Sequence, residues 1–134
     1  MSNWTHVAGV IRIDALRLDN DPYDFKAYFD NLIGKECRFN DDARIWKEQR
    51  EYPDEYLPMG SEGSLHKHIW INPDKSHLSA YTVTIFGDLR DHDDPQEIVN
   101  WFKKKCRKLN IRQATISVDN ESNGTINYTY SDKD

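Results

Sequence analysis

The sequence contains few cysteines and no long apolar run, and each shortage narrows the class of protein. Cys37 and Cys106 are its two cysteines among 134 residues, which is too few for the disulfide framework of a small secreted domain. We therefore expect reduced thiols and a cytoplasmic location. No apolar stretch approaches the roughly 20 residues that a membrane span requires, so we expect no membrane partner.

Neither sign of charge dominates the chain. Asp and Glu number 23 against 18 Lys and Arg, for a net charge of −5, and both signs are mixed along the sequence. This balance disfavours a general nucleic-acid or anionic-membrane binder and is too even for a DNA mimic. Aromatic residues, in contrast, are plentiful: four Trp, seven Tyr and five Phe supply large areas for burial. The length and composition predict a single α+β domain over residues 1–134.

The sequence also lacks the motifs of an enzyme. No nucleophile elbow occurs, and Gly60–Ser64 lacks the lysine and following helix of a phosphate loop. His66 and His68 stand two apart, which on a strand permits zinc binding with His6 as a third ligand, but hydrogen-bonded or solvated histidines fit the same spacing. Asp88–Asp94 offers ligands for a divalent ion, yet helix capping explains its acids. We predict no catalytic residue, metal or cofactor.

Hydrophobic periodicity predicts the order of strands and helices. Period-two alternation indicates strands, helical spacing of apolar residues indicates helices, and two Asp-Pro pairs mark helix starts. The stretch Lys35–Ser64 is the least regular, and long connections of this kind are often binding loops. The predicted elements are a strand over Val7–Asp14, a helix from Asp21-Pro22 to Gly34, a short helix over Ala43–Arg50, two strands within Leu65–Leu89 joined by the turn Asn72–Ser76, a helix from Asp94-Pro95, and strands over Ile111–Asp119 and Gly124–Tyr130.

A basic run near the end of the last predicted helix is expected to form a solvated face. Cations near a helix C-terminus complement its dipole, which explains the run without a phosphate ligand. The run consists of Lys103, Lys104, Lys105, Arg107 and Lys108.

The element order predicts a ferredoxin-like βαββαβ sandwich with an additional C-terminal strand and a long loop between the first helix and the second strand. Both helices are then expected on one face of an antiparallel sheet, with a right-handed crossover. Alternation assigns to this covered face Ile11, Ile13, Ile69, Ile71, Val83, Ile85, Ile116 and Val118.

The opposite sheet face is the best candidate for binding, because it combines polar groups with aromatic rings. Ferredoxin-like sheets use this surface for RNA, small ligands or dimerisation. A face that is merely covered by the long loop or by a second subunit fits the same pattern. The candidate ligand- or partner-binding residues are Arg12, His66, His68, Trp70, Thr84 and Phe86.

Two segments, Leu57–Ser64 (LPMGSEGS) and Thr84–Asp91 (TIFGDLRD), resemble those of small uncharacterised accessory proteins carried by bacteriophages and mobile elements. The resemblance extends over about half of the chain and brings no catalytic motif. It implies an accessory role in the cytosol of a bacterial host, such as interference with a host defence system, and transfers no site residue.

These features predict a small non-enzymatic binding protein, expected to be a homo-oligomer, that engages a host protein or sequesters a nucleotide-like ligand. In the nucleotide version, Arg12 or Gly60–Ser64 contacts phosphate. Two alternatives stay open. One is a metal-assisted phosphoesterase that uses His66, His68 or Asp88–Asp94. The other is a single-stranded nucleic-acid-binding module, which the net charge disfavours.

Overall fold

The computed structural model describes the greater part of the chain. The described residues are 3–14, 22–37, 42–71, 81–92, 94–109 and 111–130, and for 22–26 only the backbone is described. Two predicted features, the turn Asn72–Ser76 and the helix cap Asp21, lie outside these residues. Within them, no helix has the length and apolar content needed to cross a membrane.

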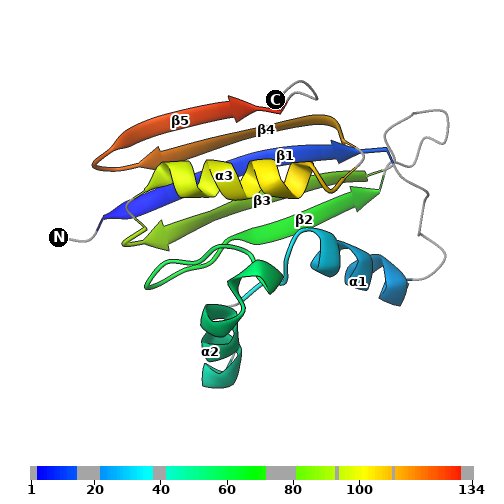
Figure 1. Cartoon of the computed structure of the whole chain (residues 1–134), viewed down its shortest axis with the longest axis horizontal. Helices are drawn as coiled ribbons and strands as arrows, with labels where there is room; N and C mark the ends of the chain where they lie inside the picture. The colour runs from blue at the N-terminus through cyan, green and yellow to red at the C-terminus, as the bar shows by residue number, and fades with distance from the viewer. Residues whose placement is uncertain are drawn as a thin grey trace.

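The described fold consists of five strands, three α-helices and one short 3-10 helix (Figure 1). In chain order they are β1 (Trp4–Ile13), α1 (Pro22–Leu32), α2 (Ala43–Glu51), η1 (Pro53–Glu55), β2 (His66–Ile71), β3 (Tyr81–Arg90), α3 (Pro95–Cys106), β4 (Ile111–Asn120) and β5 (Gly124–Thr129).

The strands form one antiparallel sheet in the order β2-β3-β1-β4-β5. β1 lies at the centre, and its Val10 is opposite Thr84 of β3 on one side and Thr115 of β4 on the other. α3 crosses one face of the sheet, and α1 lies beside β2 (Figure 1). The predicted α+β class with an antiparallel sheet is confirmed.

Burial alternates along the central strands, which divides the sheet into a core face and an open face. In β1, Ile11 and Ile13 are buried whereas Arg12 between them is exposed. All eight residues assigned to the covered face belong to the core or pack against it. Ile69 and Ile71 are only half-buried, because β2 is an edge strand. Each fully buried aliphatic side chain contributes about 1.5–3 kcal/mol relative to exposure.

The long connection between α1 and β2 is folded onto the core. The predicted short helix is confirmed as α2, which ends one residue later than expected, and the Asp42 carboxylate caps its first amides. Gln49 of this helix is buried, and its Nε2 donates to the Leu57 carbonyl oxygen at 3.0 Å. Leu57 and Leu65 are fully buried in the main core. The connection therefore packs mainly on the helix-covered side of the sheet.

α3 begins where the sequence predicts, because the Asp94 carboxylate accepts a hydrogen bond from the Gln96 amide at 3.0 Å. One expectation about this helix is wrong. Lys105 does not join a solvated basic face but is buried, and its Nζ donates to the Asp54 carbonyl oxygen at 3.2 Å. Desolvation lowers the pKa of this amine, because burial disfavours its charged form.

Candidate functional site

The six candidate binding residues all lie on the sheet face opposite α3, which we call the open face. They occupy three neighbouring strands, and the ladder between β2 and β3 places His66 opposite Phe86 and His68 opposite Thr84. The rings of His66 and Phe86 lie 6.0 Å apart, centroid to centroid. The six are Arg12 from β1, His66, His68 and Trp70 from β2, and Thr84 and Phe86 from β3.

Trp70 and Phe86 are the two large apolar side chains that the open face exposes most. They are 49% and 47% exposed. Trp70 is opposite Thr82, four residues along β3 from Phe86, so the two rings start from backbone positions on neighbouring strands about 14 Å apart. Two half-exposed aromatic rings at this spacing can enter two separate pockets of a partner.

Arg12 stands on β1 across Thr82 from Trp70. Its Nη1 donates to Oε1 of Gln113 on β4. The guanidinium is thus oriented along the sheet toward β4 rather than toward Trp70, and the two residues do not form a stacked pair in this structure.

The end of the open face nearest the N-terminus is acidic. His6 lies opposite Asp88 of β3 and Asp119 of β4. Its Nδ1 is 2.6 Å from Asp88 Oδ1, and its Nε2 is 3.3 Å from Glu121 Oε2. We call His6, Asp88, Asp119 and Glu121 the acidic end. Hydrogen bonds to Asp88 and then to Glu121 raise the pKa of His6, because both carboxylates favour the imidazolium.

The histidines proposed as zinc ligands are not brought together. His6 is on β1, separated by β3 from His66 and His68, and both of its ring nitrogens face carboxylates. His66 Nδ1 instead lies 3.6 Å from Glu36 Oε2. In the part of the chain that the structure describes, no group of three His, Cys, Asp or Glu side chains is placed to hold a metal ion.

The backbone of the Gly60–Ser64 segment is hydrogen-bonded to the end of β3 and within the segment itself. The Ser61 amide donates to the Arg90 carbonyl oxygen at 2.8 Å, and the Arg90 amide donates to Glu62 at 3.0 Å. The Gly60 amide donates to the Gly63 carbonyl oxygen at 3.0 Å. The segment is therefore hydrogen-bonded to the end of β3, and these amides are not available to cradle a phosphate.

The acidic run before α3 is divided among separate structural tasks. Asp88 belongs to the acidic end, Asp91 accepts a hydrogen bond from Ser61 Oγ at 2.9 Å, and Asp94 caps α3. Asp93 lies outside the described residues. The described acids of this run thus satisfy local hydrogen bonds and do not converge on one point.

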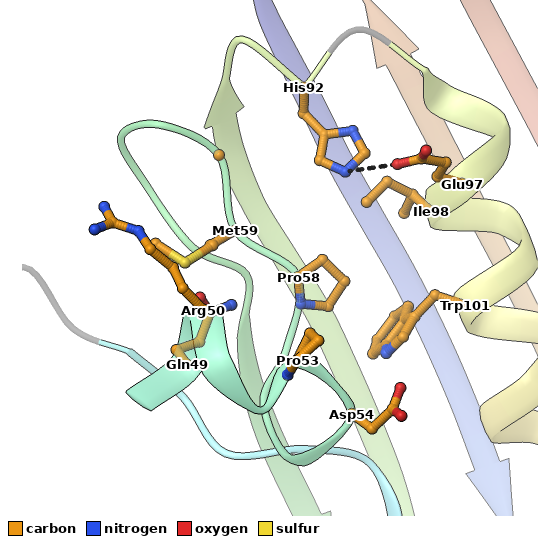
Figure 2. Close-up of a pocket in the computed structure, with 11 residues that line it drawn as sticks. Gln49, Arg50, Pro53, Asp54, Pro58, Met59, His92, Glu97, Ile98 and Trp101 are labelled. Atoms are coloured by element: carbon orange, nitrogen blue, oxygen red, sulfur yellow. Dashed lines mark ion pairs between the residues drawn. The ribbon is translucent and has the colours of Figure 1, made fainter. Parts of the chain in front are cut away.

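A cleft on the helix side of the sheet is a feature that the sequence analysis missed. It has a volume of about 420 Å³ and lies between α3 and the connection from α2 to β2 (Figure 2). Trp101 and Glu97 project from α3, and Pro53 and Pro58 form the facing wall (Figure 2). The walls come from segments distant in sequence, so the pattern shows Trp101 only as part of the apolar stripe of a helix.

Two buried polar atoms of the cleft residues are unpaired. Trp101 Nε1 and His92 Nδ1 have no hydrogen-bond partner among the described residues. The other ring nitrogen of His92, Nε2, lies 3.7 Å from Glu97 Oε2 (Figure 2). Both atoms are inaccessible to solvent, so each is an unsatisfied buried group that costs about 1–3 kcal/mol rather than a group open to a molecule in the cleft.

Comparisons with protein-family models, with curated proteins and with solved structures find no match for this chain.

Proposed function

We propose that the chain is a non-enzymatic binding protein that engages another protein through its open face. The observation that carries this proposal is the half-exposure of Trp70 and Phe86 on a sheet face that α1 and α3 leave uncovered. Exposed apolar groups rimmed by polar residues are typical of interaction sites, and aromatic side chains dominate the binding energy of protein interfaces.

The charges favour a protein over a nucleic acid. The acidic end holds three carboxylates around one imidazole, and Arg12 at the other end already donates to Gln113. The chain carries a net charge of −5. A phosphate backbone would be repelled by this surface. The complementary partner is a protein surface with two apolar pockets and Lys or Arg at the side that meets the acidic end.

The resemblance to bacteriophage accessory proteins suggests where this partner belongs. We propose a protein of the bacterial host, in the cytosol, with interference in host defence as the role. The polar, threonine-rich surroundings of the two rings fit a soluble partner surface, because the rim of a protein interface is polar and wet.

We also infer a ferredoxin-like arrangement for the first four strands. β1 and β2 are both antiparallel to β3, which lies between them, and β3 and β4 are both antiparallel to β1. Each pair is thus parallel with one strand inserted, as in a split βαβ unit. This supports two interleaved split units with β5 added at the edge. An experimental structure with β1 outside the centre of the sheet would contradict the assignment.

Native mass spectrometry of the untagged protein isolated from bacterial cells tests the proposed function. We expect the wild type to retain a protein partner, and the double variant Trp70→Ala, Phe86→Ala to be recovered without it. The matched control is Tyr52→Ala, because Tyr52 is a comparably exposed aromatic (53%) located at the end of α2. Retention of the partner by the double variant, or release of a nucleotide or metal in place of a protein, would contradict the proposal.

The cleft supports a second candidate function, the binding of a small nucleotide-like ligand. The cleft volume of about 420 Å³ and the Trp101 ring in its lining favour it, and Arg50, also in the lining, can supply a cation to a phosphate. A thermal-shift panel of mononucleotides tests it. The expected result is a rise in Tm that Arg50→Gln reduces, because glutamine keeps a polar side chain at this exposed position and removes the cation. No rise for any nucleotide would eliminate this candidate.

A further inference from the structure

The outer edge of β5 has a row of backbone groups directed away from the sheet. The Tyr130 amide donates to the Ala114 carbonyl oxygen at 2.8 Å, so this opposed pair is hydrogen-bonded. Antiparallel pairs alternate between bonded and non-bonded, and the β4–β5 register pairs Thr115 with Thr129. The N–H and C=O groups of Thr125, Asn127 and Thr129 therefore point outward, and β5 ends the sheet in the described structure.

The opposite edge of the sheet is protected, which makes the β5 edge distinctive. On β2, the outward amide of Lys67 donates to Glu36 Oε1 at 2.9 Å, and Lys67 Nζ pairs with Asp30 Oδ1 at 2.6 Å. Figure 1 shows α1 beside this edge. An edge charge and a covering segment are the usual defences against strand addition. β5, with the sequence GTINYT, has no charged residue and no proline.

We propose that a second copy of this chain adds to the β5 edge, so that two β5 strands pair antiparallel across a two-fold axis at Asn127. In this register each copy offers three N–H and three C=O groups, from Thr125, Asn127 and Thr129, to the same three residues of the other. The result is a continuous ten-stranded sheet across two chains, which is an isologous interface.

The side chains of β5 are self-complementary in this register. A two-fold axis at Asn127 places Ile126 of one copy opposite Tyr128 of the other, and the symmetry creates two such pairs. Both side chains are half-buried and pack against the core on the helix side, and pairs of an aromatic with a β-branched residue stabilise a sheet by about 0.2–1 kcal/mol. On the open face, Thr125 meets Thr129 and Asn127 meets itself.

The lack of charge on β5 supports a second copy as the occupant of this edge. The chain has 23 acidic and 18 basic residues, and none of them belongs to β5. β5 is a stretch without charge, and self-pairing there brings no like charges into opposition. This inference is independent of the proposed partner site, because β5 and β2 are at opposite edges of the sheet.

The test is sedimentation velocity of the full chain at concentrations up to about 0.5 mM, because small interfaces are weak. We expect a concentration-dependent dimer of the 15.8 kDa chain. Asn127→Lys should weaken association at least about tenfold, since it sets two ammonium groups in opposition at the axis. Asn127→Pro should do the same by removing an outward N–H that the monomer does not use.

His68→Lys is the matched control, because it adds the same charge on the open face of the other edge strand. It should dimerise like the wild type. Amide hydrogen exchange of the unmodified protein gives a second measurement that needs no variant: Asn127 and Thr129 should gain protection at high concentration, whereas Ile126 should be protected throughout. A wild type that stays monomeric, a dimer insensitive to both Asn127 variants, or unprotected outward amides in a dimer would overturn the proposal.

Discussion

His6 holds its charge between two carboxylates at the acidic end of the open face. Because Asp88 and Glu121 raise its pKa above the ordinary 6.5, the charged imidazole stabilises the folded chain below about pH 6.5, and this contribution is lost as pH rises through the raised pKa. The ring is 44% exposed, so we expect no more than about 1 kcal/mol. His6→Gln should therefore lower Tm near pH 6 and leave it unchanged near pH 9.

The control for this prediction is the double variant Asp88→Asn, Glu121→Gln, which removes the two carboxylates that face the His6 ring. In this background, His6→Gln should have the same effect on Tm near pH 6 as near pH 9. A pH dependence that persists without the two carboxylates would show that they do not control His6.

The proposed binding role of Trp70 and Phe86 requires that neither side chain contribute much to stability. Each side chain is about half-exposed, and Phe86 contributes one cross-strand ring contact, to His66. We expect Trp70→Ala and Phe86→Ala each to lower the free energy of unfolding by about 1 kcal/mol or less. Phe102→Ala, in the fully buried core, should cost about 3–5 kcal/mol. Urea unfolding measures all three, and a core-like loss at Trp70 would argue against a binding role.

Among the elements, the Gly60–Ser64 segment, which is hydrogen-bonded to the end of β3, depends on a glycine. Gly63 has a φ of +80°, and an added Cβ would clash with the Asp88 carbonyl oxygen. Gly124, in the turn before β5, has a φ of +91° with open space around it. Gly124→Ala should cost about 1–2 kcal/mol from backbone strain alone. Gly63→Ala should cost distinctly more in the free energy of unfolding. Equal losses would mean that the segment is not docked as described.

Sequence patterns predict the features of an element that depend on residues nearby in the chain, but not those that depend on distant segments. Alternation in β1 and β3 and the Asp94-Pro95 cap depend on neighbours within a few residues, and these predictions are confirmed. The burial of Lys105 could not be predicted, because it depends on the Asp54 carbonyl, which is supplied from a segment far away in the chain. The cleft beside Trp101 could not be predicted for the same reason, because its walls come from segments far apart in the sequence. The six open-face residues share a side because period-two alternation fixes it.

At the scale of the whole molecule, the two faces of the sheet differ in burial. α1, α3 and the folded connection bury one face and form the core. The other face keeps its aromatic rings and its acidic end in solvent. One edge of the sheet is covered by the residues around α1, whereas the β5 edge presents unpaired backbone groups. This asymmetry is the basis for proposing the open face as the partner site and the β5 edge as the site of a second copy.

The most direct test of the account is the affinity of the captured partner for purified variants. We predict that Trp70→Ala with Phe86→Ala raises Kd at least about 30-fold, the effect of losing about 2 kcal/mol at an interface hot spot. Tyr52→Ala, an aromatic of similar exposure at the end of α2, should stay within about twofold of the wild type. An unchanged Kd for the double variant, or an equal loss for Tyr52→Ala, would contradict the claim that the open face is the binding site.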